Sequence, residues 1–207
     1  ILFRINPFRN LSFNKSIIRK NKYVINKVLF PIFITSFIEA PILWIAQVLL
    51  VRWNNIESVG SVTAILQIRS LVILIPSYIF STFLSFASKL NAQGEYSLYF
   101  KRFDTLAKVL LFAGVSLSIL LSLFSQQVLG LYGNEYRVDY IAMIFSNIEI
   151  PLFLYSGLLK LDLIVQERQK QLMYISLIWN VIWLVLLYIF LRIEVDSVIA
   201  FFASQLI

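Results

Sequence analysis

The sequence contains no cysteine and no histidine, and these two absences remove whole classes of chemistry. A disulfide framework needs cysteine, and the common structural zinc sites need cysteine or histidine ligands. Imidazole cannot serve as a general base or as part of a catalytic triad. Carboxylate-based catalysis is still possible, so these absences do not exclude every class of enzyme. We nevertheless expect no enzyme activity, no metal and no cofactor.

Charged residues are also scarce, at 14% of the chain, whereas hydrophobic residues make up 59%. Soluble domains have about 45–50% apolar residues and about 25% charged residues. Several apolar runs reach the ~20 residues that an α-helix needs to cross the ~30 Å hydrocarbon core of a bilayer. Short alternating segments typical of a membrane β-barrel are not found. The composition predicts an all-α, polytopic transmembrane helical bundle.

The apolar runs and the polar breaks between them predict about six helices. The predicted helices cover about 28–51, 59–89, 103–124, 138–160 and 172–191, with a sixth that starts near Val195 and is cut off by the end of the chain. Residues 28–207 therefore form the predicted transmembrane bundle. Residues 1–27 form a predicted basic cytoplasmic or interfacial linker that follows an upstream membrane helix. This linker fits either a segment lying on an anionic membrane surface or a solvated basic loop.

Lysine and arginine are distributed unevenly between alternate connections. One set of connections carries the N-terminal cluster and the positions Lys89, Lys101, Arg102, Lys108, Lys160, Arg168 and Lys170. The other set carries only Arg52, Arg137 and Arg192. Cytoplasmic loops are enriched in these residues, so the first set is predicted to face the cytoplasm. This bias accounts for the net charge of +7 without a nucleic-acid partner.

Three ionisable residues lie at similar depths inside predicted membrane helices. At ~1.5 Å per residue, Glu39, Arg69 and Glu149 each fall near the middle of a ~30 Å core. A charge at that depth costs ~2.5–3.5 kcal/mol on the insertion scale, so the three should face one another or a wet cavity. Arg69 is either one partner of a static buried ion pair or a substrate-binding cation. Glu39 and Glu149 either neutralise Arg69 or are protonated in the resting state, and both are candidate ion-coupling residues.

Neutral polar residues share the same depth. Gln67, Asn147 and Asn180 are predicted to form hydrogen bonds between helices, and Gln67 and Asn180 are also candidate substrate-binding residues beside Arg69. Prolines lie inside three of the predicted helices, at Pro41, Pro76 and Pro151. Such prolines free backbone groups and are used by transporters to bend helices near the midplane.

The order of these features resembles the polysaccharide repeat-unit flippases, the O-antigen and capsule exporters of the multidrug/oligosaccharidyl-lipid/polysaccharide exporter superfamily. The resemblance covers nearly the whole chain and rests on four stretches. They are FPIFITSFIEAPILWIAQVLL, VGSVTAILQIRSLVILIPSYIFSTFLSFASKLNAQGEY, LYGNEY and QERQKQLMYISLIWNVIW. A departure is the segment LSFASKL, which lacks the proline of the family's frequent Leu-Pro-x-Leu-Ser pattern.

The resemblance implies a fold and a function. The chain would be the second lobe of a two-lobed, twelve-helix transporter in the cell inner membrane. A polyprenyl-diphosphate-linked oligosaccharide would move between leaflets by alternating access, in contact with membrane lipid and other glycan-assembly membrane proteins. Arg69 matches the place of a basic residue in related lipid-linked peptidoglycan-precursor flippases, and it would bind the anionic headgroup. The alternatives are a cation-coupled multidrug or metabolite exporter of the same superfamily, a membrane-embedded glycan polymerase or ligase, and a structural subunit of a membrane complex.

Overall fold

The computed structural model describes Lys22, residues 25–53 and residues 56–206 of the chain. Throughout these residues the secondary structure is helical, with no β-strand, which confirms the predicted all-α class. Most of the predicted linker 1–27 lies outside the described residues.

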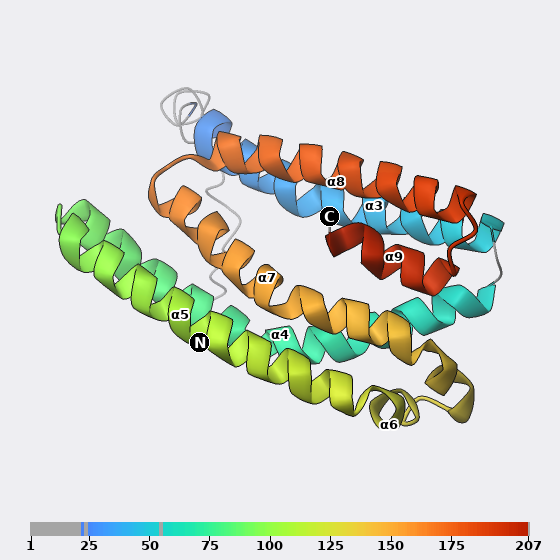
Figure 1. The fold of residues 1–207 in the computed structure, drawn as a ribbon. Coiled ribbons are helices and arrows are strands. Elements are labelled where there is room, and N and C mark those ends of the chain that lie inside the picture. The colour runs from blue at the N-terminus through green and yellow to red at the C-terminus, as the bar shows by residue number, and fades with distance from the viewer. Residues whose placement is uncertain (1–21, 23–24, 54–55, 207) are drawn as a thin grey trace, which may run out of the picture.

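The helices follow the predicted order along the chain (Figure 1). In sequence they are the π-turn η1 (Ile25–Leu29), α3 (Phe30–Trp53), α4 (Ile56–Ala92), α5 (Tyr96–Leu123), α6 (Ser125–Leu129), the 3₁₀ turn η2 (Asn134–Asp139), α7 (Tyr140–Val165), α8 (Gln169–Arg192) and α9 (Ser197–Leu206). Each of the six predicted helices has a counterpart, and α6 and η2 fill the loop predicted after the third.

Two sharp turns separate consecutive long helices at the same end of the bundle. Gly94, with φ of 73°, ends the turn between α4 and α5, where a residue without a side chain adopts a left-handed conformation easily. Glu167, with φ of 58°, makes the equivalent turn between α7 and α8. Both turns reverse the chain, so neighbouring helices run antiparallel.

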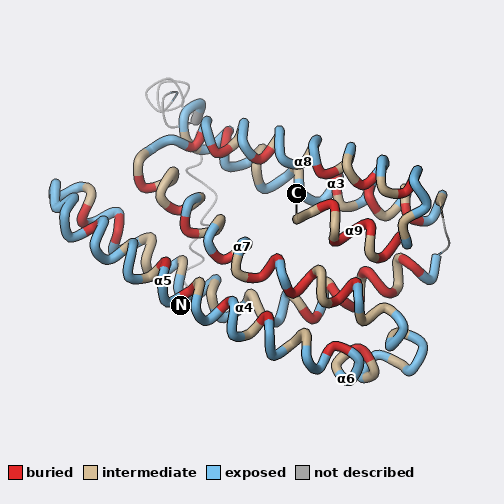
Figure 2. Tube along the Cα trace, viewed as in Figure 1, coloured by how far each residue is buried: buried red, intermediate tan, exposed pale blue. Residues whose placement is uncertain are grey.

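Helix α7 is the centre of the bundle. It packs against α5 and α4 on one side and against α9 on the other, while α3 pairs with α8 (Figure 1). Figure 2 shows buried residues along much of α7, whereas the outer helices are exposed on their outward faces. The largest core cluster joins the C-terminal halves of α3 and α8 to α9 and to the N-terminal parts of α4 and α7.

Four of the helices described are long and apolar enough to cross a membrane, namely the segments Asn26–Trp53, Ile56–Ala92, Tyr96–Leu123 and Gln169–Arg192. Their outer faces carry exposed apolar side chains such as Trp44, Leu71 and Phe112. Exposed apolar faces of this length are expected on helices that contact the hydrocarbon of a lipid bilayer. The chain is therefore a multi-pass membrane protein. Helix α7, predicted as the fourth spanning helix, is not among these four; it is the central helix and carries Glu149, Lys160 and Asp162.

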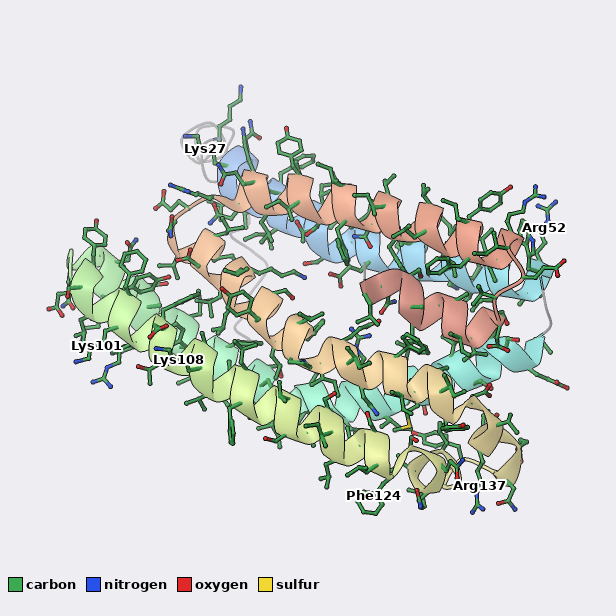
Figure 3. All side chains as sticks on the ribbon, in the orientation of Figure 1. Lys27, Arg52, Lys101, Lys108, Phe124 and Arg137 are labelled. Carbon is green, nitrogen blue, oxygen red and sulfur yellow. The ribbon has the colours of Figure 1, made fainter. Side chains whose placement is uncertain are left out.

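The connections rich in lysine and arginine and the connections poor in them lie at opposite ends of the bundle. Figure 3 shows Lys27 and Lys101 at one end and Arg52 and Arg137 at the other. We call the first the basic end. The spatial separation agrees with the alternation seen in the sequence, since each helix carries the chain from one end to the other.

Candidate functional site

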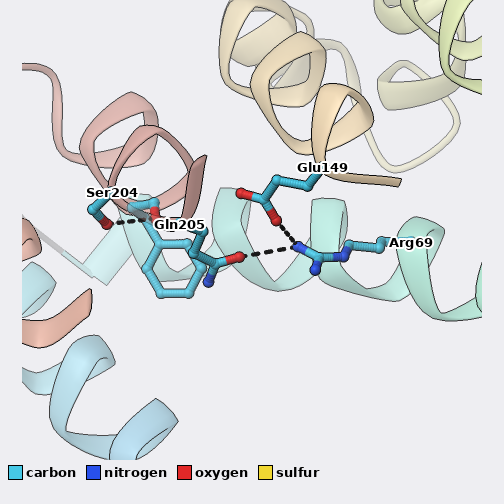
Figure 4. A network of polar contacts seen from close by, with 5 residues as sticks. Arg69, Glu149, Ser204 and Gln205 are labelled. Atoms are coloured by element: carbon cyan, nitrogen blue, oxygen red, sulfur yellow. Dashed lines mark hydrogen bonds and ion pairs between the residues drawn. The ribbon is translucent and has the colours of Figure 1, made fainter. Parts of the chain in front are cut away.

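Arg69 is joined to two other helices by its side chain (Figure 4). Its Nη1 donates one hydrogen bond to Glu149 Oε2 on α7 and another, at 3.0 Å, to Gln205 Oε1 on α9. The Arg69 and Glu149 side chains are 14% and 5% exposed. Of the two acids that the sequence offered as partners for Arg69, the structure selects Glu149.

An aromatic ring contacts the Arg69 side of this cluster. The Arg69 guanidinium carbon lies 5.3 Å from the centroid of the Phe153 ring, a cation–π contact one helical turn beyond Glu149 on α7. Ser204, the neighbour of Gln205, turns away and donates to Phe201 O on its own helix. In surroundings of low dielectric constant an opposite charge interacts far more strongly than in water. The pair between Arg69 and Glu149 is therefore the main electrostatic link between α4 and α7.

Glu149 keeps one carboxylate oxygen unused. Its Oε1 is buried and has no hydrogen-bond partner among the described residues. A buried unpaired acceptor costs ~1–3 kcal/mol, and more when the group is charged. Glu149 thus has a free position for a proton, a cation or a hydrogen-bond donor.

The remaining candidates from the sequence lie outside this cluster. Glu39 and Gln67 are exposed on α3 and α4, and neither has a hydrogen bond to Arg69 in the described part of the chain. Asn180 donates to Ser176 O within α8, and no hydrogen bond from Asn180 to another helix is found in the described part of the chain. Asn147 is buried and donates to Ser122 Oγ on α5 at 3.3 Å, which confirms the predicted interhelical role for this residue.

Gln205 was not among the predicted site residues. It lies in the short α9, which the sequence presents as the start of an apolar run, so depth counting could not place it. An amide one turn after a buried Phe201 would have been the available indication, because a polar side chain on a buried helix needs a partner.

A second polar cluster lies at the basic end and was also not predicted. Tyr99 on α5 donates its hydroxyl to Asp162 on α7, and Gln166 Nε2 contacts both carboxylate oxygens of Asp162 at 2.8 Å. Asn91 at the end of α4 donates to Val165 O at 3.0 Å. These bonds tie the ends of α4, α5 and α7 together.

Neither of two shallow hollows on the described surface includes Arg69. One, of about 470 Å³, lies at the end opposite the basic groups, between Trp53, Arg192 and Asp196. The other, of about 490 Å³, lies between α5 and Tyr155 of α7. The residues described hold no group of three or more acidic side chains arranged for a metal ion.

Comparisons with known proteins leave the family open. A scan against protein-family models, a search of curated proteins and a search of solved structures each found no match.

Proposed function

We propose that the chain is part of a flippase that exports lipid-linked oligosaccharide repeat units across the cell inner membrane by alternating access. The observation that carries the proposal is the partly buried Arg69, whose guanidinium joins α4 to α7 and α9 inside a membrane bundle. Arginine suits this role because its planar fork binds phosphate oxygens in pairs. The resemblance to polysaccharide repeat-unit flippases supplies the substrate class.

In this proposal the headgroup phosphate replaces Glu149 on the guanidinium of Arg69. Releasing Glu149 loosens the link between α4 and α7, and Gln205 can stay bonded to Arg69 because it is neutral. The interior prolines Pro76 and Pro151 lie in the same two helices and weaken their backbone ladders. Anion binding is thereby coupled to a change in how these helices pack, which is what alternating access requires.

The rest of the proposed function follows from orientation and environment. The basic end faces the cytoplasm, where the substrate is loaded, and the polyprenyl tail stays in membrane lipid. Gln67 and Asn180 are proposed to contact the substrate from other helices, and Glu39 is a proposed ion-coupling residue. Other glycan-assembly membrane proteins are the proposed partners, and no catalysis or cofactor is involved.

The unused oxygen of Glu149 favours a second candidate, a cation-coupled exporter of drugs or metabolites. There Glu149 binds the coupling cation or a cationic substrate, and Arg69 modulates the charge of the acid. The two candidates differ in which residue of the pair contacts the substrate.

Exchange of the two charges tests the proposed function in the full-length protein. Arg69→Ala should lower flipping of the lipid-linked glycan by about 10- to 140-fold, since a charge-assisted hydrogen bond contributes about 1.5–3 kcal/mol. Arg69→Glu combined with Glu149→Arg keeps the ion pair but moves the cation to α7. A purely static pair predicts that the exchange restores flipping, whereas the proposed headgroup site predicts that it does not.

The matched control is Arg102→Ala, which removes an exposed arginine at the basic end. It should flip normally at equal expression. Flipping is measured as glycan accessible to an impermeant probe in each leaflet. Normal flipping by Arg69→Ala, or full recovery in the exchange variant, would overturn the headgroup role of Arg69.

A further inference from the structure

The hollow at the end opposite the basic groups lies where α3 and α8 end and α9 begins. Its lining combines apolar and charged side chains, among them Trp53, Leu191, Val195, Arg192, Glu194 and Asp196. We call it the Trp53 hollow. Its volume of about 470 Å³ falls within the ~300–1,000 Å³ that is usual for sites of small molecules. The hollow therefore has room for a small ligand that is polar on one side and apolar on the other.

Two of the charged side chains in the Trp53 hollow are held in place by their own contacts. Arg192 donates through Nε to the Tyr188 hydroxyl at 3.0 Å, and its guanidinium carbon lies 5.9 Å from the centroid of the Trp53 ring. Asp196 accepts two backbone N–H groups of α9 through Oδ1, at 3.0 and 3.1 Å. Among the described residues, neither the Arg192 Nη atoms nor Asp196 Oδ2 has a hydrogen-bond partner. The hollow thus presents oriented donors from Arg192 and an oriented acceptor from Asp196.

Glu194 adds a second carboxylate from the turn between α8 and α9. Its φ is 61°, and Val195 N donates to Phe190 O, the bond that closes this kind of helix end. In the part of the chain that the structure describes, the Glu194 carboxylate has no ion-pair partner. Glycine usually fills such a position because it adopts the left-handed conformation without strain. A glycine can therefore replace Glu194 without disturbing the turn, so the role of the side chain can be tested apart from that of the backbone.

The charges around the Trp53 ring cancel. Arg192 and Arg52, whose guanidinium carbon lies 5.8 Å from the centroid of the same ring, are two cations, and Glu194 and Asp196 are two anions. A diphosphate gains little from surroundings without net charge. A neutral sugar can use both kinds of group, because its hydroxyls donate to carboxylates and accept from a guanidinium. The C–H face of a sugar ring packs on apolar surface, so the whole lining suits a sugar.

We propose that the Trp53 hollow binds one sugar residue of a glycan at the end of the bundle opposite the basic end. Sugar hydroxyls donate to Glu194 and to Asp196 Oδ2, and Arg192 donates to a sugar oxygen. The C–H face of the ring lies against Trp53. The source of the sugar rests on the proposed function, in which the glycan is loaded at the basic end and leaves at the opposite end. The hollow then holds the glycan after its headgroup has passed Arg69.

Binding of a soluble glycan to the purified full-length protein in detergent tests the site. The probe is the oligosaccharide released by mild acid from the lipid-linked glycan of the same cells, and saturation-transfer NMR measures its affinity. We expect Glu194→Gly to bind it about fivefold more weakly, the effect of losing one hydrogen bond of about 1 kcal/mol. Glu167→Gly is the matched control, because Glu167 has the same backbone conformation, with φ of 58°, at the basic end. Glu167→Gly should bind the oligosaccharide like the wild type.

Equal affinities of Glu194→Gly and Glu167→Gly would overturn the Trp53 hollow as a sugar site. Displacement of the oligosaccharide by equimolar glycerophosphoethanolamine would also overturn it, because the hollow would then bind a zwitterionic lipid headgroup. Arg69→Ala should bind the oligosaccharide like the wild type, although its flipping is reduced. Absence of binding by the wild type overturns the sugar site whether or not the protein flips the glycan. A wild type that binds the oligosaccharide but does not flip the lipid-linked glycan overturns only the proposed function.

Discussion

Asp139 is the residue for which the structure gives a clear dependence on pH. Asp139 is the last residue of η2, at the end of the bundle opposite the basic end and outside the candidate membrane spans. Burial raises its pKa above the ordinary value of 3.8; a hydrogen bond with Ser61 lowers the pKa in part, and the nearby carboxylate of Asp196 raises it. The native state thus holds this proton more tightly than the unfolded state does.

The sign of the effect on stability follows from that difference. Where the native state binds more protons than the unfolded state, stability falls as the pH rises. We expect the unfolding temperature of the protein in detergent to fall as the pH rises from about 4 through the raised pKa of Asp139. Asp139→Asn should flatten this slope, because the amide does not titrate and can still accept from Ser61. Asp104→Asn, at the exposed surface of α5, should leave the slope in place, and an unchanged slope in Asp139→Asn would contradict the assignment.

At the residue scale, the sequence predicted Glu149 as a partner of Arg69 and missed Gln205 as its other partner. The cost of a charge in the membrane was enough to single out Arg69 and Glu149, which the structure brings together. The same reasoning included Glu39, which lies exposed on α3. Depth along a helix axis is readable from sequence, but the direction in which a side chain points depends on how each helix is rotated. That rotation is set by packing, and Gln205 enters the cluster for the same reason.

At the scale of helices, the contact between α5 and α7 depends on Gly114. A Cβ placed on Gly114 would lie 3.0 Å from Pro151 Cα and 3.0 Å from Leu154 Cδ1. The first of these atoms belongs to the backbone, so it cannot turn aside, and the two helices would have to separate. Small residues permit such close approach in membrane bundles. The glycine therefore sets the spacing of α5 and α7 beside the proline of α7.

We predict that Gly114→Leu destabilises the bundle by about 1–3 kcal/mol, the usual cost of overpacking a well-packed interface. Ala113→Leu is the matched control, because Ala113 is the exposed neighbour on the same helix. Chemical unfolding of both purified variants in detergent measures the difference. Equal stability of Gly114→Leu and Ala113→Leu would show that the close approach at Gly114 contributes nothing.

The helices themselves were largely predictable, and their ends were less so. Apolar runs identified all six long or partial helices because hydrocarbon thickness demands such runs. Helix α5 begins at Tyr96, seven residues before the predicted Phe103. Its first turns carry Lys101 and Arg102, whose charges keep these turns out of an apolar run. The caps and turns that end a helix depend on local hydrogen bonds, and these change the hydropathy of the sequence very little.

At the scale of the whole molecule, charge and packing divide the bundle in different ways. Charge separates the two ends, as the alternation of basic loops predicted. Packing joins α3, α4, α7, α8 and α9 at the end opposite the basic groups, through the large core cluster, to which α5 contributes no residue. At the basic end, smaller clusters and the bonds around Asp162 join only α4, α5 and α7. The pairing of α3 with α8 and the central place of α7 were not predictable, because every helix offers apolar faces all round.

The orientation of the bundle can be tested with single introduced cysteines, because these 207 residues contain none. Single cysteines at Gln93, in the turn between α4 and α5, and at Asn134, at the start of η2, probe opposite ends, and both positions are exposed. Both replaced residues are neutral, so the charge bias that orients the chain is unchanged. With a membrane-impermeant maleimide on spheroplasts, we expect Asn134→Cys to be labelled and Gln93→Cys to be labelled only after permeabilisation. The same protein without an introduced cysteine gives the background, and labelling in the reverse order would place the basic end outside and remove the proposed direction of export.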